Sequence, residues 1–298
     1  MLTSMKLVHF WERRTLDNDM RTSLYKTADE LRMMVPAGLL TAKALDAVAA
    51  AIQPGISTLE LDAVAEKTIR DGGGVPNFQL VEGYSHAVCA SVNDAVVHGI
   101  PNDTPLAAGD VVSIDCGAKL NGWNGDSART FIVPGECEHD DAKHWLAEAN
   151  RVSDATRAAM WAGIAAFAKA RHLNDVGTEI EAEIARQPGP LGNLENYTGH
   201  GIGRDMHEDP TVFNYRVRRR GPVVRPGLAI CIEPMLTGGS PDVVVDADDW
   251  TVRAADGSVA AHWEHTVLRH RDGIWVSTAA DGGASGLAAY GITPTPIA

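Results

Sequence analysis

The stretch that most constrains this fold is residues 111–131, VVSIDCGAKLNGWNGDSARTF, in which two apolar runs each carry an aspartate. The segment predicts a β-hairpin, and residues at odd separation across an even-numbered loop, such as Asp115 and Asp126, project from the same face. A turn at Asn121-Gly122 would place the two acids diagonally, whereas a turn one residue earlier would place them opposite each other. Either register brings two carboxylates together, which is unfavourable unless a cation lies between them. The alternative is a solvated hairpin whose acids face water, and the apolar flanks argue against it.

The order of the predicted elements indicates an α+β fold built from two halves. Apolar residues recur at helical spacing over residues 27–52, where Pro36 should kink or split the helix. Residues 57–60, STLE, form a capping box that opens a second helix, which should stop at the three glycines 72–74. Further helices are predicted at about residues 141–170 and 176–186, and residues 75–135 and 196–277 are strand-like. Helices, strands, helices and strands in that order predict an α+β domain.

A short internal repeat supports the division into two halves. Residues 109–115, GDVVSID, align with residues 227–233, GLAICIE, so that each apolar strand begins at a glycine and ends at an acid. Upstream, the HGIP of residues 98–101 parallels the HEDP of residues 207–210. If the repeat reflects structural pseudo-symmetry, Asp115 and Glu233 should meet near a pseudo-twofold axis.

Composition limits the possible partners and compartments. A net charge of −13 argues against nucleic-acid binding, and the basic cluster at residues 216–220 is expected to be a solvated loop. Four scattered cysteines fit a reducing compartment, and the chain shows neither a signal peptide nor a membrane span, so a cytoplasmic location is expected. We expect residues 1–22 to form an N-terminal extension, residues 23–277 the folded domain, and residues 278–298 a flexible tail.

The second half supplies further groups of the kind that bind metals. His200 lies between glycines that would let the backbone approach a ligand closely, Glu233 ends an apolar strand, and Glu264 lies in another strand. Together with the two aspartates they make an oxygen-rich set that suits divalent Mn, Fe, Co or Zn, and four negative charges call for about two ions. His98 and His207 are then available as proton donors or hydrogen-bond partners that do not bind the metal.

The chain resembles the type I methionine aminopeptidases, which have the pita-bread fold, over about residues 25–275. The resemblance implies two pseudo-symmetric halves with a central antiparallel sheet covered by helices. Seven motifs occur in the family's order, namely NDAVVHGIP at 93–101, IDCG at 114–117, GDSARTF at 125–131, GHGIG at 199–203, HEDP at 207–210, IEPM at 232–235 and EHTV at 264–267. The resemblance implies that residues 23–277 are a metallo-aminopeptidase catalytic domain. It implies removal of an initiator methionine that precedes a small second residue.

The same resemblance implies a role for each site residue. Five residues would bind the two ions: Asp115, Asp126, His200, Glu233 and Glu264. Asp126 and Glu264 would bridge the ions, and Glu233 would also move the proton of the attacking water. His98 and His207 would contact the scissile amide and stabilise the transition state.

The methionine pocket implied by the resemblance combines matches with departures. Tyr84, Cys89 and Trp250 match family positions, whereas Met206 stands where an aromatic residue is common and Val81 stands where a tyrosine is common. Because methionine side chains adapt well to a thioether, Met206 can still line such a pocket.

The implied partners are the N-termini of peptides or nascent chains, with the ribosome as a further partner. Neither nucleic acid nor membrane is expected to bind directly, and the protein is expected to be a monomer. Two alternatives stay open: an Xaa-Pro aminopeptidase of the same fold, and a non-catalytic binding protein that kept the fold.

Overall fold

The four longer helices form where apolar spacing predicts them. The computed structural model describes residues 24–137 and 141–298, so the predicted extension at residues 1–22 lies outside the described residues. The helices are α2 (Ala28–Ala51), α3 (Thr58–Asp71), α4 (Ala142–Lys169), α5 (Asp175–Ile184) and α6 (Ala284–Leu287), with short 3-10 helices η1 (Phe78–Leu80) and η2 (Ala288–Tyr290). Thr27 and Ser57 cap α2 and α3 with capping boxes. Pro36 lies inside α2, which continues past it, so the helix is not split.

The β4–β5 hairpin has the diagonal register of the two predicted alternatives. β4 (Val111–Leu120) and β5 (Trp123–Ile132) are joined by Asn121 and Gly122, whose φ values of 52° and 79° are those of a two-residue hairpin turn. In this register Gly117 is opposite Asp126, and Asp115 is opposite Ala128. The two aspartates are therefore diagonal neighbours on one face.

All the strand pairs described are antiparallel and form four small sheets. The sheet of the hairpin adds β1 (Val75–Pro76) and β2 (Val88–Val92) to β4. One three-stranded sheet has the order β13 (Ala260–His262), β10 (Met235–Thr237) and β6 (Gly192–Asn193). A second has the order β11 (Val243–Val245), β12 (Val252–Ala254) and β3 (Ala95–Val97). The five-stranded sheet runs β15 (Gly273–Val276), β14 (His265–His270), β9 (Ala229–Ile232), β7 (Gly199–Gly201) and β8 (Glu208–Val212).

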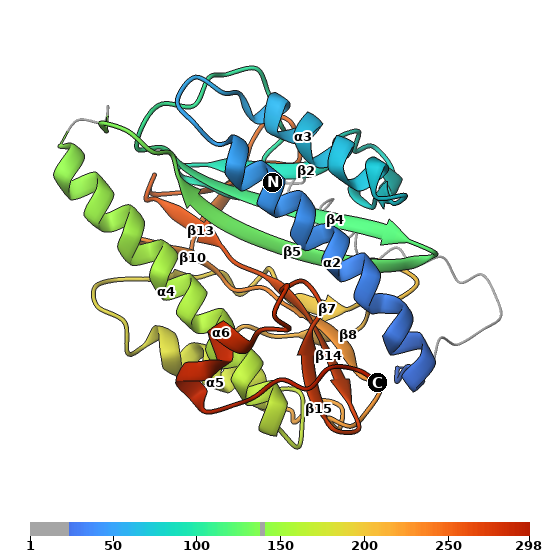
Figure 1. The fold of residues 1–298 in the computed structure, drawn as a ribbon. Helices are drawn as coiled ribbons and strands as arrows, with labels where there is room; N and C mark the ends of the chain where they lie inside the picture. Colours follow the sequence, from blue (N-terminus) through green and yellow to red (C-terminus); the bar gives the residue numbers. More distant parts are fainter. Residues whose placement is uncertain (1–23, 138–140) are drawn as a thin grey trace.

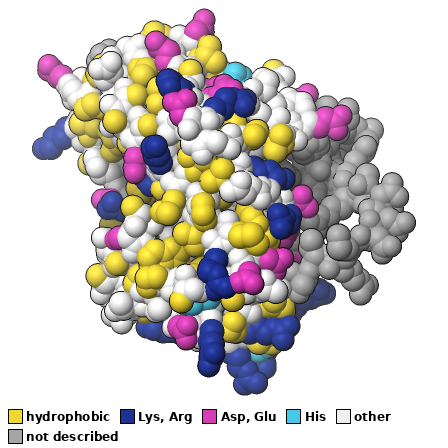
Figure 2. Space-filling model, turned by 45° about the vertical axis from the view of Figure 1, so that its right-hand side comes forward, with side chains coloured by type: hydrophobic (Ala, Val, Ile, Leu, Met, Phe, Trp, Pro, Cys, Tyr) yellow, Lys and Arg dark blue, Asp and Glu magenta, His cyan; other side chains and the backbone are white. Residues whose placement is uncertain are grey.

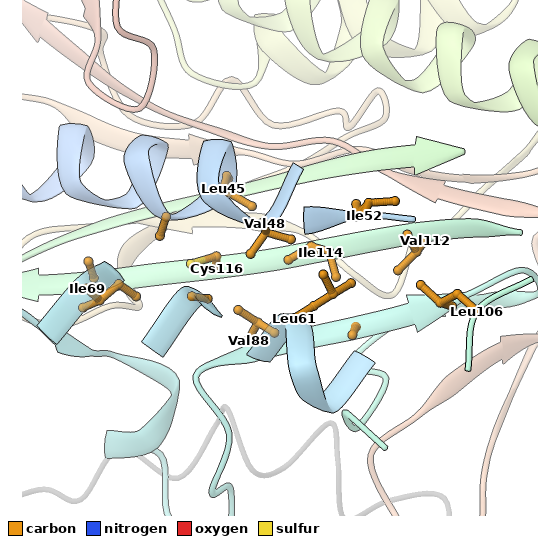
Figure 3. Packing of buried hydrophobic residues seen from close by; sticks show 14 of the residues in the cluster. Leu45, Val48, Ile52, Leu61, Ile69, Val88, Leu106, Val112, Ile114 and Cys116 are labelled. Atoms are coloured by element: carbon orange, nitrogen blue, oxygen red, sulfur yellow. The ribbon is translucent and has the colours of Figure 1, made fainter. Parts of the chain in front are cut away.

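Helix α2 lies directly across the β4–β5 hairpin (Figure 1). A Cβ added to Gly125 of β5 would lie 2.6 Å from the Cα of Gly38 of α2, so two glycines make this close approach possible. Leu45 and Val48 of α2 belong to one buried cluster with Leu61 of α3 and Ile114 of β4 (Figure 3). On the opposite side of the hairpin from this cluster, acids can therefore face the second half of the chain.

Within the described residues, α2 is the one helix long and apolar enough to cross a membrane by length and composition alone. Half of the apolar 18-residue stretch of α2 is buried inside the protein, and the helix packs on β4, β5 and α3. The apolar composition of α2 is explained by its place over the hairpin.

The two halves are joined next to the predicted ligands. The Oγ1 of Thr266 accepts a hydrogen bond from the backbone N–H of Asp126 and donates one to its carbonyl oxygen, at 3.0 and 2.8 Å. The backbone N–H of Glu264 donates to the carbonyl of Ala128 at 2.9 Å. Gly109 and Gly227, which begin the two repeats, both have positive φ values, 92° and 103°. The repeat therefore corresponds to similar local geometry in both halves.

The C-terminal segment does not form the flexible tail predicted at residues 278–298. Leu287 of α6 is fully buried in a cluster with Val276 and Met160, and the Thr278 hydroxyl lies 2.8 Å from Nδ1 of His265. The prediction relied on the Gly- and Ala-rich composition and could not foresee that small residues let α6 pack closely on Trp161 of α4.

The basic cluster at residues 216–220 is an exposed loop, as predicted, with all four of its arginines exposed. Over most of the face in Figure 2, basic, acidic and apolar side chains are interspersed.

Candidate metal centre

Three predicted acids converge from two strands of the first half and one segment of the second. Single carboxylate oxygens of Asp115, Asp126 and Glu264 all lie within 4.8 Å of one another, and the three residues are buried. Asp115 Oδ1, Asp126 Oδ1 and Glu264 Oε1 have no hydrogen-bond partner among residues 24–137 and 141–298. Buried carboxylate oxygens that lack donors are expected to face a cation.

Burial and mutual repulsion act together on these groups. Burial raises the pKa of Asp115 to about 7. Burial, followed by the charges of neighbouring carboxylates, holds the pKa values of Asp126, Glu233 and Glu264 well above their usual range. Asp115 is one of the charges that act on Glu233, so the acids that end the two repeats are near enough to interact electrostatically. Such a cluster stores an electrostatic free energy that positive ions would relieve.

His200 and Glu233 form the second part of the centre. His200 Nδ1 lies 2.9 Å from the carbonyl oxygen of Gly201, which can only accept, so Nδ1 carries the proton. Burial lowers the pKa of His200 to about 4, so the ring is neutral at pH 7 and Nε2 presents a lone pair. That Nε2 lies 3.4 Å from Oε1 of Glu233. When Glu233 is ionised, His200 Nε2 and Glu233 Oε1 each present a lone pair and neither atom carries a proton to donate, so the two atoms fit a metal ion between them.

The glycines around His200 serve a different purpose from the one the sequence suggested. A Cβ on Gly199 would lie 2.3 Å from the carbonyl oxygen of Cys231, and one on Gly201 would lie 2.1 Å from that of Asp209. The glycines therefore let β7 lie close to β8 and β9. The expectation that they make room for a ligand was wrong, because the space beside them is filled by these two strands.

Of the two predicted non-ligand histidines, His207 lies against the ligand candidate His200, and His98 lies edge-on to Tyr197. His98 has a φ of 58°, and burial lowers its pKa to about 4. The ring of His207 lies 4.1 Å from that of His200, centroid to centroid. A left-handed backbone at a non-glycine residue is unfavourable and is found preferentially at functional positions, which fits His98.

Two further residues lie in the centre that the sequence reasoning did not include. Cys231 forms a group with His200 and Glu264, but burial, followed by the charge of Glu264, holds the pKa of its thiol well above the usual range. His262 is fully buried, with Nε2 3.7 Å from Oε2 of Glu233. Burial, followed by the charge of His98, lowers the pKa of His262 to about 3. The sequence offered a signal, because His262 stands two residues before Glu264 and alternate residues of an extended segment project to the same side.

All four residues predicted to line only the substrate pocket belong to one apolar cluster. Tyr84, Cys89 and Met206 are buried there together with Phe78, and Val81, Ile100 and Trp250 pack against them. The ring centroids of Tyr84 and Trp250 are 5.0 Å apart, and the Tyr84 hydroxyl donates to the carbonyl of Val88. The sequence reasoning missed Phe78, although an aromatic residue in a loop just ahead of Cys89 was a usable signal.

A buried ion pair holds the loop that carries Met206 and His207. Glu208 Oε1 accepts from the backbone N–H groups of Arg204 and Asp205, and Oε2 accepts from Nζ of Lys26 at 2.6 Å. The side chains of Lys26 and Glu208 are both nearly inaccessible to water. Asn124 at the hairpin adds hydrogen bonds to the carbonyls of Gly203 and Arg204.

Known proteins share this fold and sequence. Residues 32–270 match metallopeptidase family M24. A curated relative, methionine aminopeptidase 1 of Mycobacterium tuberculosis, is 47% identical over 258 residues, which are 85% of this chain and 94% of the relative. The crystal structure of methionine aminopeptidase from Rickettsia prowazekii superposes with a TM-score of 0.78 at 31% identity, covering 86% of this chain and 99% of that one.

A prolidase from Pyrococcus furiosus shares the fold at a TM-score of 0.59 and 22% identity; the match covers 86% of this chain but only 65% of the prolidase. These comparisons confirm the α+β pita-bread fold and the resemblance to methionine aminopeptidases. The chain belongs to metallopeptidase family M24.

Proposed function

We propose that this protein is a dinuclear metal-dependent methionine aminopeptidase, which removes the N-terminal methionine of peptides and nascent proteins whose second residue is small. The observation that carries the proposal is the cluster of the buried Asp115, Asp126 and Glu264, in which three carboxylate oxygens lack donors among the described residues. Glu264 is also grouped with the neutral His200, which faces the buried Glu233. The identity to curated methionine aminopeptidases over most of both chains supports the reaction class.

The residues present fit divalent ions. Four acids and one imidazole are hard ligands that suit Mn, Fe, Co or Zn, and Glu264 belongs to both potential ligand groups, as a bridging residue would. Asp115, Asp126 and Glu264 would hold one ion, and His200, Glu233 and the bridging acids the other. When bound, such ions supply Lewis acidity for amide hydrolysis.

The protein's own side chains would bind the substrate and move the proton. Hydrolysis of an amide transfers one proton from water to the leaving nitrogen, and Glu233 would carry it. The imidazoles of His98 and His207 would donate hydrogen bonds to the oxygen that gains charge as the amide is attacked. The apolar cluster around Tyr84 and Cys89 would take the methionine side chain.

The setting of this activity is part of the same proposal. The enzyme would act in the cytoplasm on free peptides and on nascent chains, with the ribosome as a further partner. It would act as a monomer without binding nucleic acid or membrane directly.

The test is a metal-reconstitution series with Mn, Fe, Co and Zn, assayed on Met-Ala-Ser and Ala-Pro peptides. We expect methionine release with at least one metal. The Asp126→Asn variant should lose both metal binding and hydrolysis, whereas Asp46→Asn, an exposed acid paired with Arg129, should keep both. Cleavage of Ala-Pro alone would identify an Xaa-Pro aminopeptidase, and metal binding without hydrolysis of either peptide would identify a non-catalytic protein.

A further inference from the structure

His262 is a buried polar residue to which the proposed function assigns no role. Its Nε2 has no hydrogen-bond partner within residues 24–137 and 141–298. The nearest charged atom that the structure pairs with it is Oε2 of Glu233, at 3.7 Å. A buried ring nitrogen left without a partner is unfavourable, so its placement against a carboxylate calls for an explanation.

The position of His262 is fixed by its backbone, independently of its ring. The backbone N–H donates to Oγ of Ser113 and Oγ1 of Thr130, at 3.2 and 3.0 Å, and the carbonyl accepts from the Thr130 hydroxyl. In the β10–β13 ladder His262 is opposite Met235, which follows Glu233 by two residues. The strand pairing therefore delivers the imidazole to the Glu233 carboxylate from a second strand.

The two oxygens of Glu233 face different histidines. Oε1 lies 3.4 Å from Nε2 of His200, the ring whose other nitrogen is committed to the Gly201 carbonyl. Oε2 lies toward His262. One oxygen is thus directed to the ligand side of the centre and the other away from it, and the carboxylate could rotate if nothing held the second oxygen.

We propose that His262 is a positioning residue, whose Nε2–H donates to Oε2 of Glu233 and so directs Oε1 toward the metal ligands and fixes the carboxylate that moves the proton. This inference rests on the proposed function for its catalytic consequence, but its effect on metal binding does not depend on any substrate. Partners that orient a ligand in this way commonly change metal affinity or activity by 10- to 100-fold when they are removed.

The experiment compares His262→Gln, which keeps a donor of similar reach, with His262→Leu, which keeps the volume and loses the donor. His262→Asn, whose amide is too short to reach Glu233, serves as a polar variant in case the leucine variant does not fold. His270→Leu is the matched control, because His270 is also buried on a strand of this half but bonds to the Thr295 carbonyl.

Two measurements are made on the full chain. Calorimetric titration with Co²⁺ alone should show about a tenfold weaker affinity in the Leu and Asn variants, and an affinity within about threefold of wild type in the Gln variant. With Met-Ala-Ser, kcat should fall about 10- to 100-fold in the Leu and Asn variants with KM nearly unchanged, and the Gln variant should keep most of the activity.

Equal behaviour of the Gln, Asn and Leu variants in both measurements, whether all wild-type or all impaired, would overturn the positioning role. An inactive wild-type protein whose Co²⁺ affinity still follows the Gln-against-Leu pattern would refute the proposed function while supporting the role of His262. An active wild-type protein without that pattern would refute the role of His262 alone.

Discussion

Replacing Lys26 with methionine tests how the loop that carries His207 is held. Lys26 comes just before α2, whereas Glu208 comes from the second half of the chain, so their ion pair joins distant segments. The change removes the charge of Lys26 and keeps an apolar side chain of similar length. Glu208 would keep its hydrogen bonds from Arg204 and Asp205 and would lose its only described ion-pair partner.

The expected magnitude follows from the burial of both groups. The side chains of Lys26 and Glu208 are 6% and 5% exposed, so water cannot replace the lost ammonium group. Removing one member of a buried ion pair destabilises a protein by about 3–5 kcal/mol. At about 2 °C per kcal/mol for a chain of this size, Tm should fall by roughly 6–10 °C.

Thermal unfolding followed by circular dichroism measures this loss, and two further variants make the result specific. Lys67→Met removes one member of the exposed pair Lys67–Asp71 on α3 and should lower the free energy of unfolding by less than about 1 kcal/mol. The double variant Lys26→Met, Glu208→Gln removes both charges and keeps an acceptor for Arg204 and Asp205. It should therefore recover at least half of the lost stability.

If Lys26→Met melts within about 1 °C of wild type, the buried pair contributes no more to stability than an exposed one, and the expected loss is refuted. The expectation is also refuted if the double variant is as unstable as the single variant. In that case the loss would come from the packing of the lysine stem and not from an unpaired carboxylate.

Three further predictions concern the contacts around the centre. Gly125→Ala should lower the free energy of unfolding in urea by about 2–3 kcal/mol, since its Cβ would press on the backbone of α2. Deleting residues 284–298 should lower Tm markedly, because it removes the buried Leu287 and uncovers Val276 and Trp161; an unchanged Tm would restore the flexible-tail prediction. In metal-free protein the free energy of unfolding should fall as pH rises from 6.5 to 8. Burial raises the pKa of Asp115 to about 7, so the folded state holds a proton that the unfolded chain, with a pKa near 3.8, has already released. Asp115 alone accounts for about 1 kcal/mol over this window, and added Co²⁺ should abolish the slope. Below pH 6.5 the histidines oppose this trend, because their lowered pKa values, about 4 for His98 and His200, remove stability as pH falls.

Sequence reasoning succeeded where the determining contacts are local. The odd separation of Asp115 and Asp126 and the Asn121-Gly122 turn determine which face of the hairpin the acids share, whatever the rest of the chain does. The capping boxes at Thr27 and Ser57 likewise act within one helical turn. The residue types of the second half, taken with the internal repeat, added His200, Glu233 and Glu264 to the candidate ligands, and the resemblance to a family then assigned a role to each.

The residues that sequence reasoning missed depend on contacts between distant segments. Lys26 meets Glu208 across 182 positions of the chain, and neither residue has a local pattern that marks the other as its partner. His262 ends β13 two residues before Glu264, and its approach to Glu233 depends on the register of β13 against β10. The C-terminal segment has the composition of a tail, and its burial is decided by the surface of α4 and β15 on which it packs.

The hydrogen bonds of Thr266 explain why neither half could assemble the centre alone. Its hydroxyl both donates to and accepts from the backbone of Asp126, so the strand that follows Glu264 is registered directly on the strand of Asp126. A slip of one residue in this pairing would turn alternate side chains to the other face and separate Glu264 from Asp126 and Asp115. The pairing between the halves thus determines the distance between the acids, and their repulsion would be relieved by the cations proposed to bind there, or by protonation in the metal-free protein.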